Sequence, residues 1–180
     1  MTEPRPGADD APAIGAAELN TYFVLMEAVS LLEHRIEQQL RAEGDISYVQ
    51  FQLLARLAHG AGPLTMTELA DGVVYSRSGL TYQAGLLEKA GLVTRGPSAD
   101  DDRATLVTIT AKGLGLVARV LPGHVAVTRR LLFDPLSDAD VDRLGDIMTR
   151  VRDHMRAQPP RSAAPRSRRP GPAAPAAAAD

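Results

Sequence analysis

Cysteine is absent from this chain of 180 residues. The protein therefore has no disulfide framework, no thiolate redox sensor and no cysteine-ligated zinc site. No stretch is apolar over a length that could span a bilayer, and the N-terminal residues MTEPRPGADD lack the basic start and apolar centre of a secretory signal. We expect a protein that stays in the cytoplasm and has no membrane partner.

The motifs of common enzyme classes are missing as well. The sequence has no G-x-S-x-G elbow, no Walker loop and no dinucleotide-binding glycine fingerprint, and nothing places a serine, a histidine and an aspartate together. Its four histidines lack the spacing of metal ligands. We therefore expect no catalytic activity, no metal ion and no cofactor.

The formal net charge is only -2, but the charges are unevenly distributed along the chain. Acidic residues gather near the N-terminus and arginines near the C-terminus. Because nucleic-acid binding needs only a local basic patch, this balance does not exclude DNA as a partner.

Composition also indicates where the folded part begins and ends. Residues 1–15 and 159–180 are rich in Pro, Ala and Gly and have few large apolar side chains that could offset the entropy of ordering, so we expect both to be disordered. The remaining residues, 16–158, are long enough for one domain with a sizeable core.

Five helix starts share one signature, a Ser or Thr cap with an apolar residue just before it and another four positions after it. The five caps are Ser47, Thr65, Ser76, Thr110 and Ser137. Together with an opening helix that ends at Gly44, they predict six helices over residues 18–42, 47–59, 65–72, 76–90, 110–133 and 137–157. We expect Pro122 and Gly123 to kink or break the fifth of these helices.

Between the fourth and fifth helices, residues 92–95 and 105–109 are rich in β-branched residues and alternate in polarity, which predicts a hairpin with a long loop over residues 96–103. The predicted fold is mainly α with a small antiparallel β-hairpin. Helix, tight turn, helix and hairpin in this order are typical of a winged helix-turn-helix, which places its second helix in a DNA groove.

The helix over residues 76–90 has two different faces. At about 100° per residue, Leu80, Ala84 and Leu87 fall on one face, which we expect to pack on the core. The opposite face carries small hydroxyls, a glycine, a tyrosine and a lysine, which suit close approach to a sugar-phosphate backbone and to base edges. Its members are Ser78, Thr81, Tyr82, Gly85 and Lys89. An exposed face without a function is the other interpretation.

The loop over residues 96–103 has three consecutive aspartates and then Arg103. Asp101 lies two residues from Arg103 and would project to the same side of an extended chain, where it could fix the guanidinium for insertion into a narrow minor groove. A solvated acidic loop with an incidental arginine is the alternative.

The run from Thr67 to Gly113 resembles the MarR family of bacterial winged-helix transcription regulators. The matching parts are the helix opening SRS, the junction LEKAGLVTR, the D-x-R of the wing and the start of the next helix at Thr110 and Gly113. Many relatives have arginine where this chain has Tyr82, so base preference does not carry over. The resemblance implies contacts with double-stranded DNA at Ser76, Arg77, Ser78, Thr81, Tyr82, Lys89, Arg95, Asp101 and Arg103.

The same resemblance implies a homodimer that binds a pseudo-palindromic operator and represses transcription. The winged helix-turn-helix would cover about residues 47–109, and the helices at about 18–42 and 110–157 would form the dimer interface. The last two helices contain more apolar positions than we expect a small winged-helix core to cover. These positions are Val117, Val120, Leu121, Val125, Leu132, Val141, Leu144, Ile147, Met148 and Val151. The alternative is that they complete a monomeric core.

Relatives also imply an effector, a small aromatic or lipophilic ligand that binds between the DNA-binding lobe and the dimer helices and weakens DNA affinity. Candidate contacts are Tyr22, Met26, His34, Tyr48 and Phe51, which core packing would explain equally well. The rival for the whole chain is a winged-helix module that binds protein and lacks specific DNA binding. That rival predicts an apolar recognition face.

Overall fold

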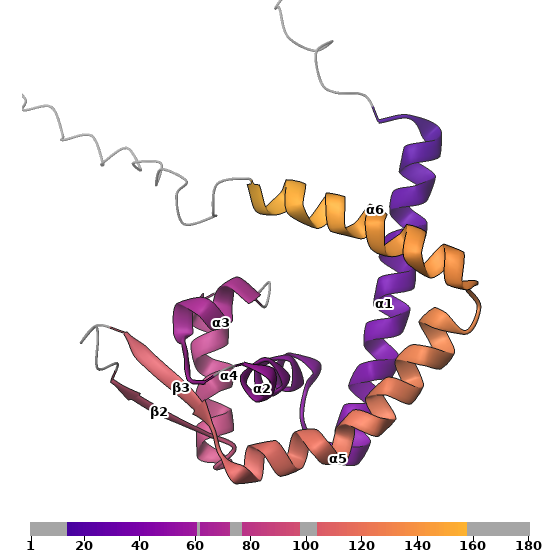
Figure 1. Ribbon diagram of the computed structural model, residues 1–180. Helices are drawn as coiled ribbons and strands as arrows, with labels where there is room; N and C mark the ends of the chain where they lie inside the picture. Colours follow the sequence, from indigo (N-terminus) through magenta and orange to yellow (C-terminus); the bar gives the residue numbers. More distant parts are fainter. Residues whose placement is uncertain (1–13, 61, 73–76, 98–103, 158–180) are drawn as a thin grey trace, which may run out of the picture. The chain divides into compact units, whose positions relative to one another are not determined.

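The computed structural model describes residues 14–60, 62–72, 77–97 and 104–157, and at residues 71, 72, 77 and 78 it describes only the backbone. The helices are α1 (Ala16–Gly44), α2 (Tyr48–His59), α3 (Met66–Gly72), α4 (Arg77–Lys89), α5 (Ala111–Thr128) and α6 (Asp138–Ala157), with a π-helical turn, η1 (Arg129–Phe133), after α5. The strands are β1 (Leu64–Thr65), β2 (Val93–Pro97) and β3 (Thr105–Ile109). These elements confirm the six predicted helices, the hairpin and the mainly α fold (Figure 1).

Side-chain caps explain why the helices begin where they do. Ser47 Oγ accepts from the Gln50 amide at 3.2 Å, and Gln50 Oε1 accepts from the Ser47 amide at 3.0 Å. Thr65 with Glu68 forms the same reciprocal pair at α3, and Ser137 with Asp140 forms it at α6. Each cap satisfies amide groups that a helix start would leave unpaired.

The sheet has three antiparallel strands in the order β1-β3-β2. Strand β3 pairs with β2 from Val93 opposite Ile109 to Pro97 opposite Thr105, as the predicted hairpin requires. Strand β1 is a third strand that sequence analysis missed, because two residues are too few to show a strand period.

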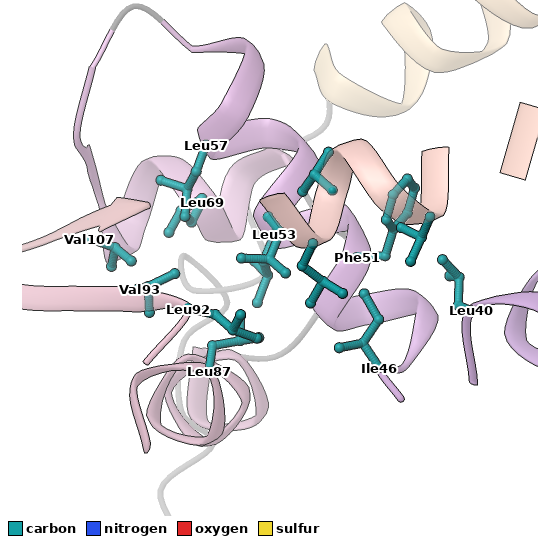
Figure 2. Packing of buried hydrophobic residues seen from close by; sticks show 14 of the residues in the cluster. Leu40, Ile46, Phe51, Leu53, Leu57, Leu69, Leu87, Leu92, Val93 and Val107 are labelled. Atoms are coloured by element: carbon teal, nitrogen blue, oxygen red, sulfur yellow. The ribbon is translucent and has the colours of Figure 1, made fainter. Parts of the chain in front are cut away.

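The hydrophobic core joins the winged-helix elements to parts of α1 and α5. Figure 2 shows Leu53 and Leu57 of α2 beside Leu87, Leu92, Val93 and Val107 of the later elements. Ile36 and Leu40 of α1 belong to the same buried cluster, as do Leu116, Val117 and Val120 of α5. The buried cluster is therefore continuous from the winged-helix elements into α1 and α5.

This core corrects part of the apolar set assigned to the dimer interface. Val117 is 5% exposed and Val120 is 0% exposed, so both are buried within one chain by packing between α1 and α5. Val125, by contrast, is 53% exposed. For Val117 and Val120 the alternative of a monomeric core is right.

The expectation for the end of α1 was wrong in detail. The left-handed residue that ends α1 is Asp45, at φ 53°, and Gly44 is the last helical residue. A Cβ at Gly44 would lie 2.8 Å from Val120 Cγ1, so the glycine is needed for close approach to α5. Of the kink or break expected at Pro122 and Gly123, the break does not occur, because α5 runs through Pro122; the kink stays a prediction.

The chain divides into two compact units, residues 1–135 and residues 136–180. Within the second unit the described element is α6, an amphipathic helix without a buried residue of its own. Across the ranges that the structure describes, no helix combines the length and the apolarity needed to cross a membrane. The same ranges contain no group of three or more His, Asp or Glu side chains placed to hold a metal ion.

Candidate nucleic-acid interface

Helix α4 separates an apolar face from a polar one, as its sequence predicts. Leu80, Ala84 and Leu87 are 1%, 1% and 2% exposed and belong to the packed side. Thr81 and Lys89 are exposed on the other side, and Tyr82 is 65% exposed. A large aromatic side chain left this open is available for contact with another molecule.

Helix α2 supports α4 from behind the exposed face. Gln50 Nε2 donates to Gln83 Oε1 at 3.1 Å, and Phe51, Leu53 and Leu54 of α2 are buried in the shared core. The exposed face of α4 is thus presented by a rigid support, which a binding site needs.

Several predicted DNA contacts lie outside the described residues. Ser76 precedes the described start of α4, and Arg77 and Ser78 are described by backbone alone, within the first turn of that helix. Asp101 and Arg103 also lie outside, in the connection between β2 and β3. The described ends of the two strands on either side are Pro97 and Thr105, which pair with each other.

Arg95 is placed against α4. Its Nε and Nη2 donate to Oε2 of Glu88 at 2.8 and 2.6 Å, and the pair joins β2 to the last turn of α4. Hydrogen bonds from Arg95 hold the pKa of Glu88 below its usual value. Sequence analysis missed Glu88, since seven residues separate the partners and only tertiary packing brings them together.

The junction from α4 through β2 to α5 is tied by hydrogen bonds. Thr110 Oγ1 donates to the carbonyl of Gly91 at 2.8 Å and accepts from the Gly113 amide at 3.1 Å. Lys112 Nζ donates to the carbonyl of Ala90, just beyond the end of α4, at 2.7 Å. A cation at a helix C-terminus is favourable, so Lys112 stabilises the end of α4.

The five predicted effector contacts lie in different environments. Tyr22 is 51% exposed and Met26 is 45% exposed on the N-terminal half of α1, and His34 is exposed further along that helix. Tyr48 is half-buried, whereas Phe51 is 5% exposed and part of the core. A pocket of about 380 Å³ near the end of α4 is lined by none of the five.

A histidine that sequence analysis did not select lies against Phe51. The rings of Phe51 and His124 have centroids 4.6 Å apart and are tilted by 46°. His124 Nδ1 and Gln39 Oε1 are buried and, among the described residues, have no hydrogen-bond partner. Gln39 Nε2 donates to the Val120 carbonyl at 3.0 Å, so both polar side chains lie where α1 packs on α5. His124 follows Pro122 and Gly123 in the sequence, and this position gave no signal that its Nδ1 atom is buried.

Burial lowers the pKa of His124 below 6.5, because the charged ring would lose its hydration. As the pH falls below 6.5, the unfolded chain takes up a proton that the folded chain resists, so the free energy of unfolding should decrease toward the lower folded pKa. We expect His124→Phe to reduce this loss, measured by urea unfolding at about pH 7.5 and 5.5. His154→Gln, at an exposed position of α6, is the control and should keep the wild-type difference. Equal pH dependence in the wild type and His124→Phe would contradict the assignment.

Comparisons with known proteins agree with this fold. The model of the MarR family matches residues 44–104. The crystal structure of Sco3205 from Streptomyces coelicolor, a MarR family transcriptional regulator in complex with DNA, is 33% identical with a TM-score of 0.76, and the match covers 82% of this chain and 95% of that one. AbsC from the same organism, also a MarR family transcriptional regulator, is 28% identical with a TM-score of 0.76 over 82% of this chain and 100% of its own.

A curated relative matches a similar share of the chain. The HTH-type transcriptional regulator MhqR of Bacillus subtilis is 26% identical over 133 residues, which are 74% of this chain and 90% of MhqR. These relatives are transcriptional regulators, not enzymes. With a winged helix-turn-helix of matching order and a relative 33% identical over nearly its whole length, this chain belongs to the MarR family of transcriptional regulators.

Proposed function

We propose that this protein binds a specific pseudo-palindromic operator as a homodimer and represses transcription from it. The observation that carries the proposal is the polar, exposed face of α4 on a helix whose other face is buried, next to a β-hairpin. Sco3205, which is 33% identical, was solved in complex with DNA. Such a function is exercised in the cytoplasm, where bacterial DNA lies.

Each proposed DNA contact has a separate task. Thr81 and Tyr82, with Ser78, would meet base edges in the major groove, and Lys89 would meet a phosphate at the end of the helix. The first turn of α4, which begins at Arg77 directly after Ser76, would offer backbone amides to a phosphate. Asp101 would orient Arg103, which would enter the minor groove.

The N-terminal half of α1 supports the homodimer. Five consecutive apolar residues, 22–26, are each at least 40% exposed, so apolar surface faces more than one side of the helix. Exposed apolar residues of α1 are Leu19, Tyr22, Phe23, Val24, Leu25, Met26, Val29 and Leu31. A helix that is apolar on all sides is normally buried. The same half of the partner's α1, with helices near the C-terminus, would bury it.

The effector site is proposed at Phe51 and His124, where α1, α2 and α5 meet. A small aromatic ligand would stack on the rings and give a hydrogen-bond partner to His124 Nδ1 or Gln39 Oε1, which are both buried and have no partner among the residues that the structure describes. Tyr48, half-buried in the first turn of α2, and His34 of α1 are further proposed contacts. Tyr22 and Met26 lie roughly 25 and 20 Å along α1 from Gln39, too far to contact the same small ligand.

The test is a gel-shift titration of the full chain with the DNA upstream of its own gene, in the presence of excess nonspecific DNA. Retarded DNA and a footprint with two half-sites about 34 Å apart would support a dimeric operator binder. A chain that shifts neither specific nor nonspecific DNA would favour the alternative, a winged-helix module that binds protein.

Tyr82 and Lys89 should affect binding in different ways. Tyr82→Ala should change which operator base pairs are preferred, because Tyr82 lies mid-helix, where base edges are expected. Lys89→Ala should lower affinity for all sequences and reduce the slope of log K against log salt by about one, as expected for one lost phosphate contact. Selection from an operator library, repeated at several salt concentrations, measures both effects. An unaltered preference profile for Tyr82→Ala would refute the base-reading role.

Arg103→Ala should weaken operator binding by more than about tenfold, because a charge-assisted contact in the minor groove is lost while the core is left intact. Melting temperature and oligomeric state should stay near those of the wild type. Asp101→Ala should cause a smaller loss of affinity, because the Arg103 side chain would lose its fixed orientation but keep its charge. Fluorescence anisotropy at physiological salt gives the affinities, and undiminished binding by Arg103→Ala would rule out the wing contact.

A further inference from the structure

The ion pair between Glu88 and Arg95 connects the proposed reading helix to the base of the hairpin. Two N–H groups of Arg95 converge on one carboxylate oxygen, Oε2 of Glu88, at 2.8 and 2.6 Å. The side chains are 30% and 37% exposed, so the pair is open to solvent and adds little to global stability. Its effect must therefore be sought in local geometry.

The guanidinium of Arg95 lies close to Gly85 of α4. A Cβ at Gly85 would lie 3.9 Å from Nη2 of Arg95, so the arginine extends along the helix surface from Glu88 back over the glycine. Gly85 lies three residues after Tyr82 and three before Glu88, so it is the neighbour of both on the helix surface, one turn from each. The ion pair thus borders the proposed base-reading face.

Arg95 lies on β2, so its ion pair with Glu88 also affects the orientation of the β2–β3 hairpin. Arg95 pairs with Val107 of β3, and Val107 in turn lies in the core at 1% exposure. Two residues later β2 ends at Pro97, and the chain continues into the segment that contains Arg103. The Arg95–Glu88 contact therefore ties β2, two residues before its end, to α4.

We propose that Arg95 is a positioning residue, which acts through Glu88 to hold the hairpin at a fixed orientation to α4, and that it is not itself a DNA contact. The resemblance to relatives had placed Arg95 among the DNA contacts. This inference rests on the proposed function, because it concerns the same interface.

The experiment compares Glu88→Gln, Arg95→Gln and the double variant in operator binding over a range of salt concentrations. A positioning role predicts that each single variant weakens binding about five- to twentyfold, that the double variant is no weaker than either, and that the salt slope is unchanged. A direct phosphate contact predicts a different pattern. Arg95→Gln would then lower the slope by about one, and Glu88→Gln would strengthen binding, since it removes a negative charge.

The binding experiment includes a negative and a positive control. Asp134→Asn removes the carboxylate of another exposed ion pair, with Arg129, and should leave binding unchanged. Lys89→Ala is the positive control for a change in salt slope. Binding by Glu88→Gln at or above the wild-type affinity would overturn the proposal.

A measurement without DNA separates this inference from the proposed function. In ¹H–¹⁵N NMR spectra of the free protein, Glu88→Gln and Arg95→Gln should both shift the amide signals of Gly96, Thr105 and Leu106, which lie on the paired strands. Unchanged signals at these residues would overturn the positioning role. A wild-type chain that binds no DNA would instead overturn the function, whatever these signals do.

Discussion

A chain that ends at Asp134 is expected to be monomeric or aggregated and to lose specific operator binding. The deletion removes α6, whose apolar positions Val141, Leu144 and Met148 are half-buried, while Ile147 and Val151 are 40% and 36% exposed. Helix α6 buries no residue completely in the described chain, so its apolar side is available to a partner protomer. Each aliphatic side chain that becomes buried contributes roughly 1.5 to 3 kcal/mol.

Loss of the dimer should abolish specific binding, because two reading helices must lie about one DNA turn apart to contact both half-sites. Analytical ultracentrifugation and gel shift measure the two effects on the same samples. The matched control ends at Ala157 and removes only residues 158–180; it should remain a dimer with wild-type affinity for the operator. If the chain ending at Asp134 sediments as a dimer and still binds the operator, the interface lies elsewhere.

The starts of the helices could be predicted from sequence because they depend on local chemistry. Ser47, Thr65, Thr110 and Ser137 each accept a hydrogen bond from an amide three residues later, within the segment that sequence analysis selected. The buried face of α4 could be predicted for a similar reason, since helix geometry alone fixes that Leu80, Ala84 and Leu87 share a side.

Contacts between distant segments could not be predicted in this way. The apolar character of Val117 and Val120 was recognised, but whether α1 of the same chain or a second chain covers them depends on packing. The partners Glu88 and Arg95, and the rings of Phe51 and His124, are likewise brought together by the tertiary fold alone. Periodicity shows which side chains share one face of a helix, but it does not show which segment or chain packs against that face.

Gly113 is a residue that sequence marked and structure explains. It was selected as part of the helix start shared with relatives, without a physical role. A Cβ at this position would lie 2.3 Å from the carbonyl oxygen of Leu92 and 2.7 Å from Ile109 Cγ1. Leu92 O also accepts from the Thr110 amide at 3.0 Å, so the carbonyl is held in place and cannot move aside without breaking that bond. The glycine therefore permits α5 to begin directly against the hairpin.

Gly113→Ala should consequently lower the free energy of unfolding by about 1 to 3 kcal/mol, the usual cost of overpacking, and should weaken operator binding because the hairpin shifts relative to α4. Gly115→Ala is the matched control in the same helix. Nothing lies within 4 Å of a Cβ at Gly115, so the alanine should stabilise the protein by up to about 1 kcal/mol through its helix propensity. Urea unfolding and gel shift of both variants measure these opposite effects. A Gly113→Ala protein as stable as the wild type, with equal DNA affinity, would show that the close approach to Leu92 is not required.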